Sequence, residues 1–114
     1  MGADGNEDEQ LAQWLASLGE AGLQLAVLAV ARRGNVTPAS ARGAIATLTV
    51  GLLAADEGRL AGVMRGLQER GYLEPEGGAF RITSAGKRYM FKVLKQWNRY
   101  VDAMNNLWGC YYGT

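Results

Sequence analysis

The stretch VMRGLQERGYLEPEGGAFRITSAGKRYM, residues 63–90, decides the fold of this chain. Its first part predicts the end of a helix, because apolar residues recur at helical spacing as far as Leu67. Gly71 follows soon after, and glycine readily takes the left-handed conformation found just beyond helix ends. A helix is therefore expected to end at about residue 70, directly before a segment of another kind.

Residues 72–83 predict a small β-hairpin. Glu-Gly-Gly at residues 76–78 makes a turn, and a strand is expected on each side of it. In the second strand Phe80 and Ile82 point one way and Arg81 the other, which is typical of a strand with one buried face.

A long helix is expected over residues 85–108, with Thr83 or Ser84 as its N-cap. The order helix, hairpin, helix predicts a mainly α fold with a small β-hairpin wing: a winged helix-turn-helix with a long C-terminal helix. The expected organisation is a flexible acidic leader over residues 1–10, a winged helix-turn-helix domain with its N-terminal helix over 11–84, a dimerisation helix over 85–108, and a tail over 109–114.

Two helices are expected between the leader and the helix-turn-helix. Apolar residues over 11–18 predict a short amphipathic helix, which Gly19 and Gly22 interrupt. A buried helix over about residues 23–33 follows, and Gly34 is placed to end it.

The helix-turn-helix itself begins at Thr37 and Pro38, an N-cap residue followed by proline at the first helical position. That helix places Ala41, Ile45 and Leu48 on one face. A turn is expected between residues 49 and 55. Asp56 then caps a helix over about residues 56–70, whose inward stripe is Leu60, Val63, Met64 and Leu67.

The composition indicates one folded, non-enzymatic domain. Apolar residues make up 48% and charged residues 20% of the 114 residues. The longest apolar run, near residues 23–31, is too short to span a membrane. Histidine is absent from the sequence, as are the phosphate-binding, CxxC and dinucleotide motifs, so no cofactor, no metal site and no catalytic residue is expected. The lone Cys110 fits a reducing, cytoplasmic location.

Charge is distributed unevenly along the chain. Residues 1–57 hold three basic and seven acidic side chains, a balance of −4, whereas residues 58–114 hold nine basic and four acidic ones, a balance of +5. A basic half is suited to contact phosphate.

If residues 56–70 enter a major groove, Arg59 and Arg65 are the outward side chains that reach guanine edges or phosphates. Phosphate contacts are expected at the start of the preceding helix and around the wing. The candidate DNA-binding residues are Thr37, Ser40, Arg42, Arg59, Arg65, Arg81, Lys87 and Arg88.

Two features favour a different partner. Gly58, Gly62 and Gly66 leave part of the exposed helix face bare, and the wing carries Glu74 and Glu76 near its tip. The alternative hypothesis is therefore a winged-helix module that binds another protein and not DNA.

The last helix carries the strongest periodicity in the chain. Six large apolar residues follow heptad spacing, which predicts a helix that packs on a second copy as a homodimer. Packing on the N-terminal helix of the same chain is the alternative. The expected dimer interface comprises Trp14, Met90, Leu94, Trp97, Val101, Met104 and Trp108.

The runs LQERGYLE (67–74), FRITSAGK (80–87) and KQWNRYVDAMNNL (95–107) resemble winged-helix regulators of the PadR-like group. The resemblance covers about residues 22–108. Residues 35–57 depart from the PadR pattern, so MarR-like and generic winged-helix regulators are near alternatives.

The resemblance implies a homodimeric repressor that binds pseudo-palindromic operators on double-stranded DNA. Some small PadR-like proteins also bind flat aromatic compounds at the dimer interface, beside a tryptophan on the last helix. Trp97 stands at the corresponding place, which implies an aromatic effector there.

Overall fold

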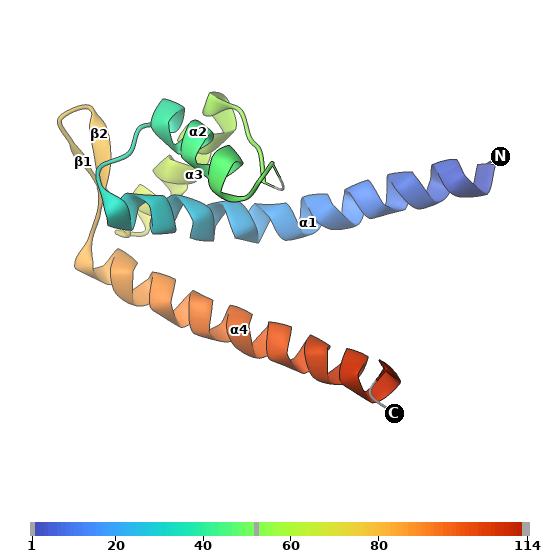
Figure 1. The fold of residues 1–114 in the computed structure, drawn as a ribbon. Coiled ribbons are helices and arrows are strands. Elements are labelled where there is room, and N and C mark those ends of the chain that lie inside the picture. Colours follow the sequence, from blue (N-terminus) through green and yellow to red (C-terminus); the bar gives the residue numbers. More distant parts are fainter. Residues whose placement is uncertain (1, 52, 113–114) are drawn as a thin grey trace.

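A computed structural model describes the backbone of residues 2–51 and 53–112, and their side chains apart from residues 2–5, 12, 14–18, 20 and 110–112. Three helices precede a two-stranded antiparallel hairpin, and a long helix follows it (Figure 1). The elements are α1 (Gly2–Arg33), α2 (Pro38–Leu48), α3 (Glu57–Glu69), β1 (Leu73–Glu76), β2 (Ala79–Ile82) and α4 (Ser84–Tyr112). This order confirms the winged helix-turn-helix predicted from residues 63–90.

The core lies where the C-terminal half of α1 meets α2, α3 and the start of α4. α1 contributes Leu23, Val27 and Leu28, each no more than 2% exposed. α3 contributes the predicted stripe, with Leu60, Met64 and Leu67 buried and Val63 partly buried. On α2, Ala41 and Ile45 are buried, whereas Leu48, expected on the same face, is 58% exposed.

The break expected at Gly19 and Gly22 is wrong, because α1 is one helix of 32 residues. A glycine inside a helix costs about 1 kcal/mol relative to alanine, and the surrounding Ala, Leu, Gln and Glu residues favour the helix. The Gly22 backbone also approaches the Leu53 side chain, so that a Cβ there would lie 3.5 Å from it. The acidic residues expected in a flexible leader belong to the first turns of α1, where negative charge complements the helix dipole.

Local signals place the ends of α2 and α3 as predicted. Thr37 and Ser40 form a reciprocal capping box, with each side-chain oxygen accepting from the other residue's backbone amide at 3.1 and 2.9 Å. Asp56 caps α3 by accepting from the Arg59 amide at 2.8 Å. After α3, Gly71 takes a φ of +81° and the Tyr72 amide donates to the Leu67 carbonyl, which is a Schellman ending.

The hairpin closes through Gly77 and Gly78, both with positive φ, as a type I′ turn requires. A backbone bridge ties the wing to the α1–α2 linker, because Val36 and Phe80 exchange hydrogen bonds at 3.0 and 2.8 Å. The wing is thereby fixed relative to the helix-turn-helix.

Helix α4 begins at a tight contact with the wing. Thr83 is its N-cap, accepting from the Gly86 amide at 3.0 Å. A Cβ at Gly86 would overlap the Tyr72 carbonyl oxygen. Next to this contact the Tyr72 and Tyr89 rings stack at 4.3 Å. The helix continues to Tyr112, through most of the segment expected to be a tail.

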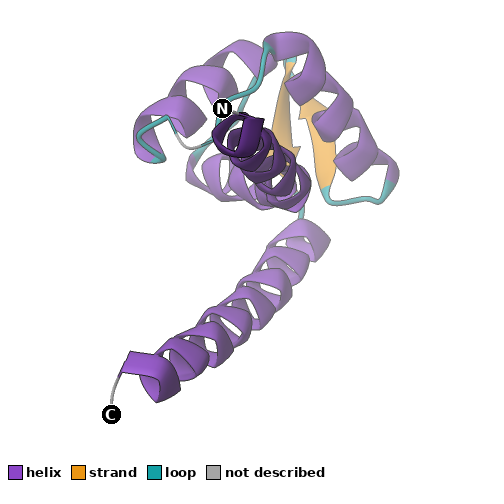
Figure 2. Ribbon diagram, turned by 90° about the vertical axis from the view of Figure 1, so that its right-hand side faces the viewer, coloured by secondary structure: helices purple, strands orange, loops and turns teal. Residues whose placement is uncertain are grey.

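The N-terminal half of α1 and most of α4 extend from the domain as two arms that diverge from each other (Figures 1 and 2). The chain is accordingly elongated, with extents of 53 × 34 × 23 Å. No helix among the described residues is long and apolar enough to cross a membrane.

Candidate nucleic-acid interface

Helix α3 presents a charged face to solvent and an apolar face to the core. Leu60, Met64 and Leu67 hold the helix in place, and Arg59 and Arg65 are both exposed. The two arginines are six residues apart, which is about 9 Å along a helix. The two side chains lie about 120° apart around the helix axis, so the solvent-facing part of α3 offers two forked donors on neighbouring sides of the helix.

The residues expected at the start of α2 are already engaged with one another. Thr37 and Ser40 use their side-chain oxygens in the capping box, and the Ser40 hydroxyl also donates to the Thr37 carbonyl at 3.2 Å. Arg42 is exposed, and its guanidinium lies 3.7 Å from the Glu57 carboxylate at the start of α3. Contacts of exposed ion pairs are weak, so Arg42 can exchange Glu57 for a phosphate at small cost.

Arg81 on the wing is paired with acidic neighbours. It donates a hydrogen bond to Glu74, and its Nε lies 3.9 Å from Glu76 Oε2. The hydrogen bond to Glu74, followed by the charges of Glu74 and Glu76, raises the pKa of the Arg81 guanidinium above its ordinary value. The pairing directs the charge of Arg81 to the wing itself.

Lys87 and Arg88 are exposed in the first turns of α4, directly after the wing. They follow Arg81 closely in the chain, because β2 ends at Ile82, directly before Thr83, the cap of α4. The candidate residues therefore fall into two groups along the chain, one on α2 and α3 and one on β2 and the start of α4.

A groove beside α3 was not predicted from the sequence. It has a volume of about 430 Å³ and is lined by Gln24, Arg59, Gly62, Val63, Gly66, Leu67 and Arg70. An added Cβ at Gly62 or Gly66 would meet nothing within 4 Å among the described residues, so packing against those residues does not require glycine at either position. Gln24 comes from α1, and no local sequence pattern signals that it faces α3.

The heptad stripe of α4 divides between the core and solvent. Met90, expected in the dimer interface, is 4% exposed and packs in the chain's own core, because the base of α4 lies against α1. Farther along the arm, Leu94, Trp97 and Trp108 are 37%, 46% and 53% exposed. Val101 and Met104 are partly exposed. The side chain of Trp14 lies outside the described residues.

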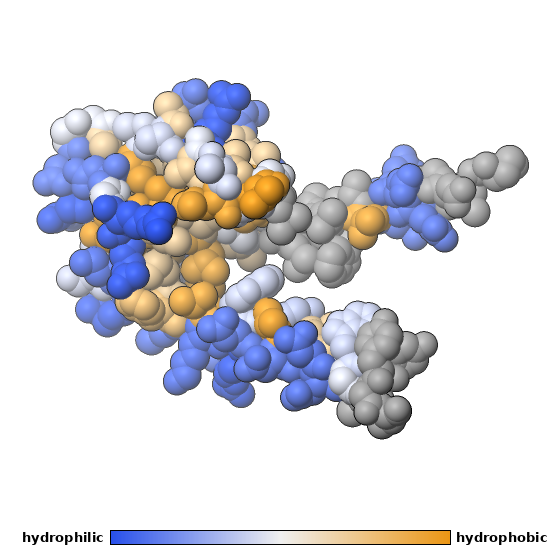
Figure 3. All heavy atoms as spheres, viewed as in Figure 1, coloured by the Kyte–Doolittle hydropathy of each residue, from blue (hydrophilic) through white to orange (hydrophobic). Residues whose placement is uncertain are grey.

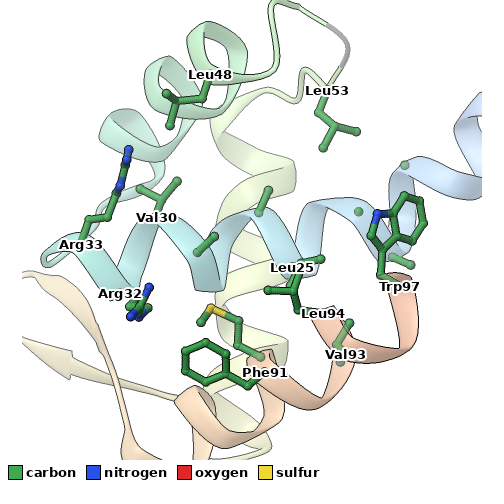
Figure 4. A pocket seen from close by; sticks show the side chains of 16 residues that line it. Leu25, Val30, Arg32, Arg33, Leu48, Leu53, Phe91, Val93, Leu94 and Trp97 are labelled. Atoms are coloured by element: carbon green, nitrogen blue, oxygen red, sulfur yellow. The ribbon is translucent and has the colours of Figure 1, made fainter. Parts of the chain in front are cut away.

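An apolar cleft of about 660 Å³ lies along α1 between α4 and the end of α2. In Figure 4, Leu94 and Trp97 border it on the α4 side, and Leu48 and Leu53 on the other side. Figure 3 shows apolar residues gathered on this face of the domain, with hydrophilic residues along the outer side of α4. Arg32 lies at the inner end of the cleft, 5.1 Å from the centre of the Phe91 ring.

The fold and the arginine-bearing α3 together define a winged helix-turn-helix protein with a long C-terminal helix. No protein-family model matches the sequence, and no curated protein matches it. Solved structures do match: a PadR-family transcriptional regulator from Eggerthella lenta aligns with a TM-score of 0.73 at 20% identity, over 90% of this chain and 95% of that chain. A transcriptional regulator from Clostridium thermocellum aligns with a TM-score of 0.70 at 19% identity, over 79% and 93%.

These likenesses show the fold. The chain has the winged-helix architecture of a PadR-family regulator, including the long helix after the wing. The resemblance predicted from residues 67–74, 80–87 and 95–107 is thus confirmed at the level of the fold.

Proposed function

We propose that this chain is a homodimeric, DNA-binding transcriptional regulator that places α3 in a major groove. The observation that carries the proposal is the two-sided character of α3: its apolar face is buried, and its solvent face presents Arg59 and Arg65. A helix held in this way costs little further ordering when its side chains bind base edges. The solved structures of like fold are described as transcriptional regulators, which supports the proposal.

The roles of the remaining residues follow from their places. Arg59 and Arg65 read bases or clamp the flanking phosphates. Arg42, Lys87 and Arg88 contribute phosphate contacts that orient the domain. At the start of α2, Thr37 and Ser40 hold through their capping box the helix end that faces the backbone of the duplex.

Dimerisation is proposed through the exposed part of the α4 stripe, from Leu94 to Trp108. Burying one large apolar side chain fully contributes about 1.5–3 kcal/mol, so Leu94, Trp97 and Trp108 together offer a substantial driving force for association. In such a dimer the two α4 helices set the separation of the two α3 helices, and hence the spacing of the DNA half-sites.

An aromatic effector is proposed for the cleft that Trp97 borders. The cleft has the size and apolar lining of a small-molecule site, and the indole ring is 46% exposed. A planar ligand stacked on Trp97 would contact both α1 and α4. It would thereby alter the angle between the α3 helices of the two subunits.

Fluorescence anisotropy with duplex fragments, from about 50 to about 200 mM salt, tests the DNA-binding proposal. The wild type is expected to prefer some fragments and to bind all of them more weakly as salt rises. Arg65→Ala should cost about 1–3 kcal/mol on preferred fragments and relax the preference. Arg99→Ala, the same change on the exposed face of α4, is the matched control and should leave the preference unchanged.

Absence of binding at the lowest salt would contradict the proposal. The glycine-lined groove beside α3 and the acidic wing would then favour the alternative function, a module that binds another protein. For the effector, planar aromatics should quench tryptophan fluorescence in the wild type but not in Trp97→Ala. Equal quenching in both would remove Trp97 from the site.

A further inference from the structure

The outward face of the wing carries three charged side chains that pair with one another. Glu74 and Arg81 lie directly opposite in the antiparallel register, and Arg81 donates a hydrogen bond to Glu74. Arg81 Nε lies 3.9 Å from Glu76 Oε2. Arg81 is the only basic residue in the sequence from 73 to 82, so the wing has one cation set against two carboxylates.

A residue outside the hairpin holds this arrangement in place. Asn35, in the linker between α1 and α2, donates from Nδ2 to Glu76 Oε2 at 3.0 Å. The next residue, Val36, is joined to Phe80 of β2 by two backbone hydrogen bonds. The position of the Glu76 carboxylate is thereby defined relative to α2, and it does not depend on the hairpin alone.

In the proposed complex, the wing is expected beside the backbone of the duplex, because it follows α3 closely in the chain. β1 begins at Leu73, only four positions after α3 ends at Glu69. The major groove is about 12 Å wide, so the strands that border it come within reach of elements at the end of a groove-bound helix. A phosphate arriving at the wing would meet a net charge of −1, the sum of Glu74, Glu76 and Arg81.

We propose that Glu74 and Glu76 restrain DNA binding by withholding Arg81 from the phosphate backbone. The inference rests on the proposed function and adds a role for the wing. Phosphate contacts strengthen binding to every sequence alike, whereas base contacts discriminate between sequences. The two carboxylates therefore set the overall affinity, and α3 sets the preference among sequences.

The test is the double variant Glu74→Gln, Glu76→Gln in the full chain. Glutamine keeps the side-chain shape and one oxygen that can accept from Asn35 or Arg81, and it removes the negative charge by replacing the other oxygen with an NH2 group. Affinity should rise about threefold to tenfold on all duplexes by a similar factor. The slope of log K against log salt should steepen by about 0.9 for the phosphate gained by each subunit, and so by about 1.8 for the proposed dimer. Adding Arg81→Ala to the double variant should abolish the steeper slope.

Glu9→Gln makes the same chemical change at an exposed position of α1 and should change neither quantity. It belongs to the N-terminal part of α1, which extends away from the wing (Figure 1). An unchanged affinity and slope in the double variant, with the wild type binding DNA, would overturn the role of the wing and leave the proposed function standing. A gain that survives Arg81→Ala would overturn it too, because long-range charge alone would explain the effect. No binding by any variant at low salt would overturn both.

Discussion

Gly86 is predicted to be indispensable for the packing of α4, because the helix begins with its backbone against the backbone of Tyr72. A Cβ at position 86 would overlap the Tyr72 carbonyl oxygen and would lie 2.8 Å from Ile82 Cγ1 and 3.0 Å from the Tyr72 carbonyl carbon. The carbonyl cannot turn aside freely, because it accepts a hydrogen bond from the Thr83 amide at 3.1 Å.

The size of the effect follows from opposing contributions. Overpacking in a tight region costs about 1–3 kcal/mol, and a lost hydrogen bond between Thr83 and Tyr72 adds about 1 kcal/mol. Alanine favours the helix over glycine by up to about 1 kcal/mol. Gly86→Ala should therefore lower the free energy of unfolding by about 1–3 kcal/mol.

Gly62→Ala is the matched control. Gly62 is exposed in the interior of α3, and a Cβ there would meet nothing within 4 Å among the described residues. The same substitution should raise the free energy of unfolding by about 0.5–1 kcal/mol, since helix propensity acts without a clash. The two glycine-to-alanine changes should thus have opposite signs.

Urea unfolding followed by far-UV circular dichroism measures both effects. All three proteins must be compared at one protein concentration, because association of the chains would contribute to apparent stability. A Gly86→Ala protein as stable as the wild type would refute the close contact between α4 and Tyr72. A loss of stability in Gly62→Ala would refute the open space over that face of α3.

Leu94→Asp should convert the proposed dimer to monomer, as measured by size-exclusion chromatography with light scattering. Gln96→Asp, which lies outside the heptad stripe of α4, should leave the dimer intact. Dimers of both variants would contradict association through the stripe. Asp56→Ala removes the N-cap of α3 and should lower the free energy of unfolding by about 1 kcal/mol in urea titrations; an unchanged midpoint would show that the cap contributes nothing. Gly78→Val forces a β-branched residue to a φ of +81° and should lower Tm, whereas Gly77→Asn suits a type I′ turn and should not; equal Tm losses would contradict the assigned turn.

The features that could be predicted from the sequence are those decided within about one helical turn or one hairpin. The N-caps Thr37 and Asp56, the ending at Gly71 and the two-glycine turn depend on hydrogen bonds and φ values among neighbouring residues. The inward stripe of α3 follows in the same way, because 3.6-residue periodicity states which side chains share a face.

Continuity of α1 and burial of Met90 depended on packing that sequence patterns do not contain. Two glycines within four residues indicated a break, yet the helix gains enough from its neighbours, including Leu53, to continue. The heptad spacing in α4 predicts which side chains share a face. It does not predict how far along that face α1 covers them. Met90 is covered and Trp97 is not, because the two helices diverge.

The charges at the candidate interface show the same division. The sequence predicts that the arginines at positions 42, 59, 65 and 81 all contact DNA. Tertiary structure pairs Arg42 with Glu57 across the α2–α3 corner, and it brings Asn35 to Glu76, the carboxylate beside Arg81. Local interactions act over a few residues and can therefore be predicted from the residue types of neighbours. The contact between residues 35 and 76 forms only after the helices and the hairpin have packed.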